Sequence, residues 1–285
     1  MSTKDEIAVS YDVGNDFFRL WLDERMNYTC AVFDETDDLE EAQLAKLATL
    51  YEYGKVTADS RVLDIGCGWG ANLEYLAVDR GVRDVHGITL SEAQHAEILA
   101  RRIPGVTVGC VSYLDYAPPT TFDAIMSICM IEHVCTPQEA RKGEAVERYR
   151  DYFQRAWKWS SPGAHFALQC ILRVRTPRDR ADIREIGWAS RHQLPGGLAP
   201  RMEDIVQAAE PYWEILHVRT RRLDYRRTCE HWRARLRQHE AVIRDRWGDR
   251  LFEDYDRYMT ACVRGFEQRY LSLAQWSLRR LDNID

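Results

Sequence analysis

Short apolar runs alternate with longer amphipathic stretches between residues 60 and 170. Short runs that end at glycine or polar residues predict strands, and the longer stretches predict helices. The predicted strands are Arg61–Ile65, Asp84–Ile88, Val106–Val111, Phe122–Ile128 and His165–Leu172, and the predicted helices are Ala71–Asp79, a stretch from the N-cap Ser91 to Arg102, and Glu139–Trp159. This alternation predicts parallel βαβ units, and therefore a doubly wound, mostly parallel α/β sheet.

The chain on either side of this alternation follows a different pattern. Upstream, Asn15–Glu24 and Leu39–Tyr53 are typical of amphipathic helices, and Met26–Phe33 joins them. Downstream, an Arg-rich stretch precedes sequence that is predicted to be mostly helical from Arg226 to Arg280. We expect one domain over 1–285, with an N-terminal helical lid at 1–58, a ligand-binding core at 59–172, and a substrate-facing insertion, last strands and helical cap at 173–285.

The composition is that of a globular protein, with 45% hydrophobic and 29% charged residues among 285. No run approaches the roughly 20 apolar residues that cross a bilayer, and the start of the chain is polar rather than signal-like. We therefore expect a cytoplasmic protein without stable membrane insertion. The net charge of −6 disfavours nucleic acid as a partner. The oligomeric state does not follow from the sequence.

Arginine is the dominant basic residue, and most of it follows Arg141. Two interpretations stay open: the base composition of the source genome, or a wall of guanidinium groups that binds phosphate. The eight cysteines form no C-x-x-C pair and no zinc-type spacing, so we expect no metal site. Apart from Cys30, they are expected to be buried thiols that pack as small apolar side chains.

A glycine-rich turn follows the first predicted strand, in the order Val62-Leu-Asp-Ile-Gly-Cys-Gly-Trp-Gly70. Glycines in such a turn let the backbone approach a ligand closely. No Lys-Ser/Thr pair follows, which excludes a phosphate-binding P-loop of the nucleotide triphosphatases. The spacing G-x-G-x-G after a strand Asp is similar to the first motif of class I S-adenosylmethionine methyltransferases.

The second predicted strand leads into Thr89-Leu-Ser-Glu-Ala-Gln94, without the acidic residue that most class I methyltransferases carry there. This T-L-S-x-x-Q pattern resembles the cyclopropane fatty acid synthase family, which includes the mycolic acid cyclopropane synthases. Further segments agree with that family over roughly residues 9 to 280: Tyr11–Phe18, Asn27–Phe33, Leu39–Lys46, Ile131–His133 and Leu194–Gly197. The resemblance implies a Rossmann-like methyltransferase sheet with N-terminal helices and a helical substrate cap.

The resemblance also implies S-adenosyl-L-methionine as the cofactor. When the family's cofactor-binding positions are transferred to this sequence, the resemblance implies the following binding residues: Tyr28, Thr29, Asp64, Gly66, Gly68, Gly70, Thr89, Leu90, Gln94, Tyr113 and Ile128. Thr89 and Gln94 would replace the usual ribose-binding acid. The acidic residue that the family places near Tyr113 is replaced here by Ser112.

Members of this family transfer a methyl group to an alkene carbon, which leaves a carbocation that must lose a proton. In the family a bicarbonate held by a Cys, a Glu, a His and a Tyr takes this proton. Cys30, Glu132 and Tyr225 retain three of these catalytic positions, and Gln169 stands where the His is usual. A Gln cannot carry charge or shuttle a proton. Two alternatives stay open: bicarbonate bound without the His, or Glu132 as the direct base.

The product depends on which proton leaves. Loss from the added methyl closes a cyclopropane, and loss from a neighbouring carbon gives a methylated alkene. The altered base position favours the methylated alkene.

The substrate is expected to be a lipid-like small molecule. Arg173, Arg175 and Arg178 follow the fifth predicted strand, at the end of the sheet where ligands bind. With the arginines around Tyr225 they predict a diphosphate-binding wall, which favours an isoprenoid diphosphate. In the other interpretation, these arginines hold no ligand. They form a solvated face and pair with Asp179, Asp182 and Glu185.

Three other functions stay open: modification of an unsaturated acyl chain, N-methylation of a small amine, and cofactor binding without catalysis.

Overall fold

The computed structural model describes residues 13–193 and 195–282. Tyr11, Asp12 and Leu194, which belong to two of the family segments, lie outside these ranges. The strands are β1 (Arg61–Ile65), β2 (Asp84–Thr89), β3 (Val106–Cys110), β4 (Phe122–Ile128), β5 (Ser160–Arg173), β6 (Trp213–Thr220) and β7 (Leu271–Arg280). The helices are α2 (Asn15–Phe18), α3 (Leu39–Tyr53), α4 (Ala71–Glu74), a π-helical turn (Tyr75–Asp79), α5 (Glu92–Arg101), a 3₁₀ turn (Ile131–His133), α6 (Pro137–Arg141), α7 (Ala145–Lys158), α8 (Arg180–Gln193), α9 (Met202–Ala209), α10 (Arg222–Gln238), α11 (Glu240–Trp247) and α12 (Asp249–Glu267).

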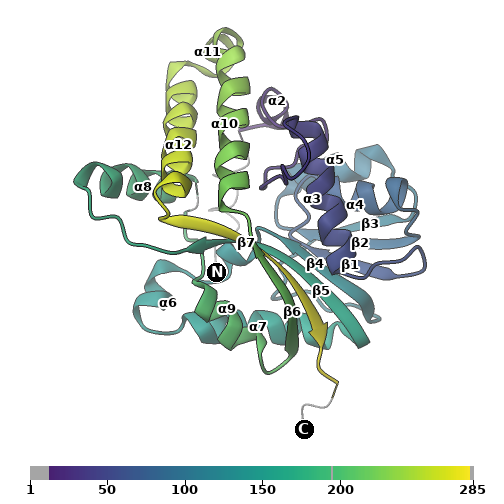
Figure 1. The fold of residues 1–285 in the computed structure, drawn as a ribbon. Coiled ribbons are helices and arrows are strands. Elements are labelled where there is room, and N and C mark those ends of the chain that lie inside the picture. The colour runs from purple at the N-terminus through teal and green to yellow at the C-terminus, as the bar shows by residue number, and fades with distance from the viewer. Residues whose placement is uncertain (1–12, 194, 283–285) are drawn as a thin grey trace.

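Within the described residues, seven strands form one sheet in the order β3-β2-β1-β4-β5-β7-β6 (Figure 1). β1 to β5 pair in parallel, while β7 runs antiparallel to both β5 and β6. The order reverses at β1, between β2 and β4, and a doubly wound sheet binds ligands at such a point. The predicted fold class, a mostly parallel sheet flanked by helices, is confirmed.

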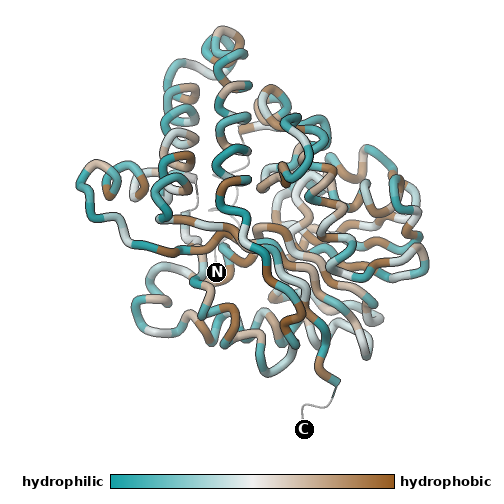
Figure 2. Tube along the Cα trace, in the orientation of Figure 1, coloured by the Kyte–Doolittle hydropathy of each residue, from teal (hydrophilic) through white to brown (hydrophobic). Residues whose placement is uncertain are grey.

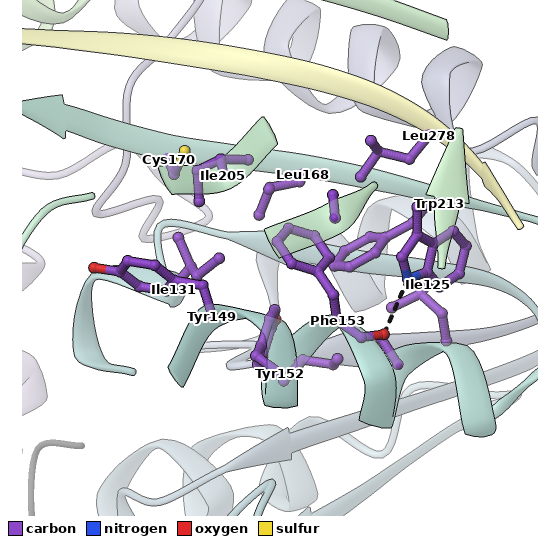
Figure 3. Close-up of a cluster of buried hydrophobic side chains, with 14 of the residues drawn as sticks. Ile125, Ile131, Tyr149, Tyr152, Phe153, Leu168, Cys170, Ile205, Trp213 and Leu278 are labelled. Atoms are coloured by element: carbon purple, nitrogen blue, oxygen red, sulfur yellow. Dashed lines mark hydrogen bonds between the residues drawn. The ribbon is translucent and has the colours of Figure 1, made fainter. Parts of the chain in front are cut away.

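Alternation along the strands gives the sheet two apolar faces. Leu63 and Ile125 point to the face covered by α7, whereas Val62 and Ala124 point to the face covered by α3. Figure 3 shows the α7 side, where Phe153 and its neighbours pack against strand residues and Trp213 donates a hydrogen bond to the Phe153 carbonyl at 3.0 Å.

A third apolar cluster joins the N-terminal segment to the helices that project from the sheet. Phe17 and Trp21 contact Tyr255 of α12, and Trp21 also contacts Trp232 of α10. In Figure 1, α10 and α12 rise side by side beyond β7, and Figure 2 shows hydrophilic residues along both. None of the helices in the described ranges offers the length and apolar character that a bilayer crossing requires.

Three predicted elements differ from the structure. The helix expected over Asn15–Glu24 ends at Phe18, and the chain continues in turns, in which the Leu20 and Trp21 N–H groups donate to carbonyls three residues back. The helix expected over Glu139–Trp159 is two helices, broken at Gly143, whose φ of +82° interrupts the helical path.

The third difference is at the C-terminal end. The mostly helical prediction to Arg280 is wrong for Leu271–Arg280, which forms β7 between β5 and β6. The side chains of β7 alternate between the two faces of the sheet. Its hydrogen-bonding partners, β5 and β6, are distant in sequence, so local pattern does not reveal this strand.

Candidate active site

The glycine-rich turn connects β1 to α4 in left-handed backbone conformations. Gly66 and Gly68 have φ values of +80° and +55°, which L side chains rarely adopt. The N–H groups of Gly66 and Cys67 both donate to the Ile88 carbonyl of β2, at 2.9 and 3.0 Å. A Cβ on Gly68 would meet no protein atom within 4 Å, so the turn leaves open space beside its backbone.

This open space belongs to a cavity at the carboxyl ends of β1, β2 and β4. Ten of the eleven predicted cofactor residues line it: Tyr28, Thr29, Asp64, Gly66, Gly68, Thr89, Leu90, Gln94, Tyr113 and Ile128. Gly70 does not line it. It precedes α4, and a Cβ there would meet Ile98 at 2.9 Å, so its role is helix packing.

The wall that would face the ribose is neutral. Thr89 donates its hydroxyl to Gln94 Oε1 at 2.7 Å, and the Thr89 oxygen accepts from the Ser91 N–H at 3.2 Å. Ser91 also caps α5, because its side chain accepts from the Gln94 N–H. These bonds fix the Thr89 and Gln94 side chains at the wall of the cavity.

At the base of the cavity, Asp64 and Asn72 present oxygens without partners. Asn72 Nδ2 donates to Asp64 Oδ2 at 3.0 Å, while Asp64 Oδ1 and Asn72 Oδ1 accept no hydrogen bond from the described residues. Burial raises the pKa of Asp64 to about 6. Because buried acceptors are normally satisfied, these two oxygens fit a ligand with an ammonium group, such as the amino-acid end of S-adenosylmethionine.

The segment between α2 and α3 forms another wall of this cavity. Tyr28 packs between Trp21 and Trp232, each with ring centroids 5.2 Å away. Gln43 of α3 donates to the Thr29 carbonyl at 2.9 Å. The cap and the N-terminal segment therefore enclose the cavity together.

Sequence reasoning missed several residues of the cavity, chiefly Asn27, Lys46 and Asn72. The sequence pattern could have indicated Lys46, because it lies on the stripe of α3 that also carries Leu39, Ala42 and Leu50, where an apolar residue is expected. A lysine there is buried, and a buried lysine needs polar partners.

Glu132 lies directly after β4, in the 3₁₀ turn beside the cavity residues Cys129 and Met130. Its side chain is 2% exposed. Oε1 accepts from the Ile171 N–H of β5 at 2.6 Å, and Oε2 accepts no hydrogen bond from the described residues. Burial raises the pKa of Glu132 to about 7, although the Ile171 N–H and the neighbouring Cys129 thiol oppose this shift. A carboxylate with one free oxygen and a pKa near neutrality is suited to take a proton.

The structure brings the other predicted catalytic residues to the same place. Gln169 Nε2 faces the Cys30 carbonyl at 3.4 Å and the Cys129 sulfur at 3.6 Å. Gln169 Oε1 accepts from Gln275 of β7 at 2.8 Å. Tyr225 is buried near Cys30 and Cys129, and burial raises its pKa well above the usual value. Cys30, Gln169 and Tyr225 thus gather near Cys129, which lines the cavity, while these three residues and Glu132 lie behind the described lining.

The predicted arginine wall is divided by the structure. Arg173 donates to the Ala199 carbonyl at 2.8 Å and lines a second cavity with Arg141 and Arg201. Arg175 and Arg178 are exposed and line neither cavity.

The arginines beside Tyr225 have structural partners instead. Arg221 is 3% exposed and pairs with Asp34 at 2.6 Å. Arg222 donates to the Phe266 carbonyl, Arg226 pairs with Glu230, and Arg227 pairs with Asp37. The expectation that they join the diphosphate site is wrong, because carboxylates and carbonyls of the chain already occupy these guanidinium groups.

No group of three or more His, Cys, Asp or Glu side chains suited to a metal ion occurs in the part of the chain that is described.

The model of the mycolic acid cyclopropane synthetase family matches residues 1–276. The chain belongs to this family. It is 32% identical over 267 residues to the cyclopropane-fatty-acyl-phospholipid synthase of Escherichia coli, a match that covers 93% of this chain and 65% of the relative. It is 27% identical to cyclopropane mycolic acid synthase 2 of Mycobacterium bovis, over 96% of this chain and 94% of that one.

Among solved structures, the cyclopropane synthase MmaA2 from Mycobacterium tuberculosis aligns with a TM-score of 0.89 and 27% identity, over 98% of each chain. These matches confirm the predicted family and the fold class.

Proposed function

We propose that the chain is an S-adenosylmethionine-dependent C-methyltransferase that adds a methyl group to an alkene carbon of a lipid-like small molecule. The observation that carries this proposal is the buried Glu132 carboxylate, which keeps one oxygen free beside a cavity that fits the cofactor. When bound, the cofactor supplies a methyl group on a positively charged sulfur.

The chain's own residues would hold the cofactor by its two ends. The glycine turn leaves space for the amino-acid part, and Asp64 and Asn72 offer acceptors for its ammonium. Thr89 and Gln94 stand where the ribose hydroxyls are expected, and Tyr113 lies in the wall assigned to the adenine. Tyr28 and Thr29 close the cavity on the side of the cap.

The substrate's π electrons would form the new carbon–carbon bond as the bond between the methyl carbon and sulfur breaks and leaves its electron pair on the sulfur. The positive charge would then lie on the neighbouring carbon of the former alkene. Tyr225, stacked on Phe266 with centroids 4.6 Å apart, offers aromatic faces that stabilise a cation. Glu132 Oε2 then takes one proton and leaves a neutral product. Burial of Tyr225 keeps it neutral through this step, because its pKa is raised.

Of the two bases that the sequence left open, the contacts of Gln169 support Glu132 as the direct base. Its amide oxygen accepts from Gln275, and its nitrogen faces the Cys30 carbonyl and the Cys129 sulfur. Both ends of the amide are therefore engaged by the protein. Bicarbonate would have to displace at least one of these contacts.

An isoprenoid diphosphate is the substrate that we favour. The second cavity provides three guanidinium groups, and neither Arg141 nor Arg173 forms an ion pair with a described residue. Leu198 in its wall donates its N–H to the Glu132 carbonyl at 2.8 Å, so the cavity adjoins the base. Guanidinium groups match phosphate oxygens in bidentate geometry.

An unsaturated acyl chain is the second candidate substrate. It is supported by the names of two relatives, a cyclopropane-fatty-acyl-phospholipid synthase and a cyclopropane mycolic acid synthase. The chain spans 65% of the Escherichia coli relative, so that protein's own substrate is not transferred to it.

The test is incubation of the purified chain with methyl-labelled cofactor and a panel of isoprenoid diphosphates, unsaturated acyl lipids and small amines, followed by NMR of the labelled product. We expect a methylated alkene from a diphosphate. Cyclopropyl protons at high field would contradict the alkene product, and label found only on nitrogen would contradict C-methylation.

The anionic subsite has its own test. We expect Arg141→Ala and Arg173→Ala to raise KM for a diphosphate substrate about 10-fold or more, because each removes a charge-assisted contact. Arg178→Ala is the matched control, since this exposed arginine lines neither cavity. Equal KM values in all three variants would contradict a phosphate site in the second cavity.

A further inference from the structure

Lys46 is a buried cation whose side chain reaches the cofactor cavity. It lies on α3, is 1% exposed, and lines the cavity together with Asn27, Thr29 and Asp64. Lys46 occupies a position on the buried stripe of α3 where an apolar side chain would pack without needing a polar partner.

The ammonium group has hydrogen-bonding capacity to spare. Its Nζ donates to Asn27 Oδ1 at 2.7 Å and to Thr29 Oγ1 at 3.1 Å. An ammonium carries three N–H groups, and no described residue accepts the third. No hydrogen bond or ion pair joins Lys46 to Asp23, whose Oδ1 and Oδ2 accept the backbone N–H and the side-chain Nδ2 of Asn27, at 2.8 and 2.7 Å.

The charges in the cavity wall have opposite signs. Among the described lining residues, Lys46 is the one lysine, no arginine is present, and Asp64 is the one carboxylate. Asp64 keeps Oδ1 without a partner. A ligand that satisfies both groups presents an ammonium to Asp64 and an anionic oxygen to Lys46, which is the charge pattern of an α-amino acid.

We infer that Lys46 receives the carboxylate of the cofactor's amino-acid end and holds Asn27 and Thr29 in place around it. This inference rests on the proposed use of S-adenosylmethionine and adds the residue that recognises its carboxylate. Two functions follow from one side chain: a charged contact with the ligand, and a link between α3 and the segment that closes over the ligand.

The test is a calorimetric titration of the purified chain with three ligands. They are S-adenosylmethionine, its decarboxylated analogue, which keeps the ammonium but lacks the carboxylate, and 5′-methylthioadenosine, which lacks both. We expect the unaltered chain to bind S-adenosylmethionine about 10-fold or more tightly than the decarboxylated analogue, because a buried charged contact is lost with the carboxylate.

Lys46→Gln should remove this preference: the affinity for S-adenosylmethionine falls about 10-fold or more, while that for 5′-methylthioadenosine changes less than about 2-fold. Lys46→Arg, which keeps the charge, should retain part of the preference. Lys55→Gln is the matched control, because it removes the same charge from an exposed position beyond the end of α3.

Each outcome bears on one of the two ideas. A preference for the carboxylate that persists in Lys46→Gln would overturn the role of Lys46 and leave the proposed function intact. Equal losses for all three ligands would overturn it as well, since the loss would then be structural. If the unaltered chain binds none of the ligands, the proposed function fails and the inference fails with it.

Discussion

At the scale of single residues, burial sets the chemistry of the site. Glu132 and Glu185 are the same residue type, yet burial raises the pKa of Glu132 to about 7, whereas the Arg257 and Arg184 guanidinium groups lower that of the partly exposed Glu185 to about 2. Glu185 is a surface acid in an ion pair, and Glu132 is able to exchange a proton near neutral pH. Sequence position alone does not distinguish these two environments.

We predict that Glu132→Gln lowers kcat by at least about 100-fold, because an amide cannot take the proton. Cofactor affinity should stay within about 2-fold, since Gln can still accept from the Ile171 N–H. Steady-state kinetics and calorimetric titration measure the two effects. A variant that keeps normal turnover would contradict the role of Glu132 as the base.

The pH dependence of kcat/KM tests the same residue in the unaltered chain. Glu132 must be ionised to accept a proton, and burial raises its pKa to about 7. Activity should therefore rise with pH, reach half its maximum near pH 7, and level off above. A half-maximum near the ordinary pKa of a Glu side chain would show that another group limits the rate.

Cofactor binding should depend on pH in the opposite direction, through Lys46. Burial lowers the pKa of Lys46 to about 8, and the facing groups Asp23, Cys129, Cys30 and Asp64 oppose this shift. The ammonium is charged below this pKa and neutral above it, so affinity for S-adenosylmethionine should fall as pH rises through about 8. Titrations of the unaltered chain and of Lys46→Gln between pH 6.5 and 9.5 would show this; the expected fall is absent in the variant.

At the scale of elements, the sequence pattern correctly predicted those helices and turns whose geometry depends on neighbouring residues. Leu39–Tyr53 matches α3 at both ends, and the N-cap Ser91 starts α5 as expected. The glycine turn lies where its spacing placed it, because a sharp return from strand to helix needs left-handed residues. β7 was misread, because its role depends on hydrogen bonds to β5 and β6, which are distant in sequence.

Two substitutions in the glycine turn should separate folding from cofactor binding. Both Gly66→Ala and Gly68→Ala impose a strain of about 1 to 2 kcal/mol, because both positions have positive φ. A Cβ on Gly66 would also come within 2.6 Å of Met130 Cγ, whereas a Cβ on Gly68 projects into open cavity space.

We therefore expect Gly66→Ala to lower the free energy of unfolding more than Gly68→Ala does, and Gly68→Ala to weaken cofactor binding while the fold persists. Urea denaturation and calorimetric titration measure the two quantities. Unchanged cofactor affinity in Gly68→Ala would contradict the assignment of this space to the cofactor.

At the scale of the whole molecule, ion pairs of the Arg-rich half link distant parts of the chain. Arg221, at the start of α10, bonds to Asp34 before α3 and to Gln275 of β7 at 3.2 Å. Arg235 of α10 pairs with Glu40 of α3 at 2.8 Å. Part of the arginine excess therefore connects the cap, the sheet and the N-terminal segment, and does not face a substrate.

We predict that Arg221→Met lowers the free energy of unfolding by about 2 kcal/mol, because it leaves the buried Gln275 oxygen without its donor. Arg219→Met is the matched control: Arg219 pairs with the same Asp34 at 3.1 Å, but it is half exposed, and such pairs contribute less than about 1 kcal/mol. Urea denaturation measures both. Similar losses in the two variants would show that burial of Arg221 does not matter.

The sequence by itself determined the βαβ alternation, the glycine turn, the family and, through the family, most of the residues that line the cavity and the position of Glu132. These features depend on short segments whose geometry is local. The tertiary structure alone decided which charges are available for chemistry. It paired Gln169 with Gln275, placed Arg221 against Asp34, grouped Arg173 with Arg141 and Arg201, and turned Lys46 toward the cofactor cavity. Each of these contacts joins residues far apart in the chain, and burial, which sets their energies and protonation, exists only once the sheet and its cap have closed around them.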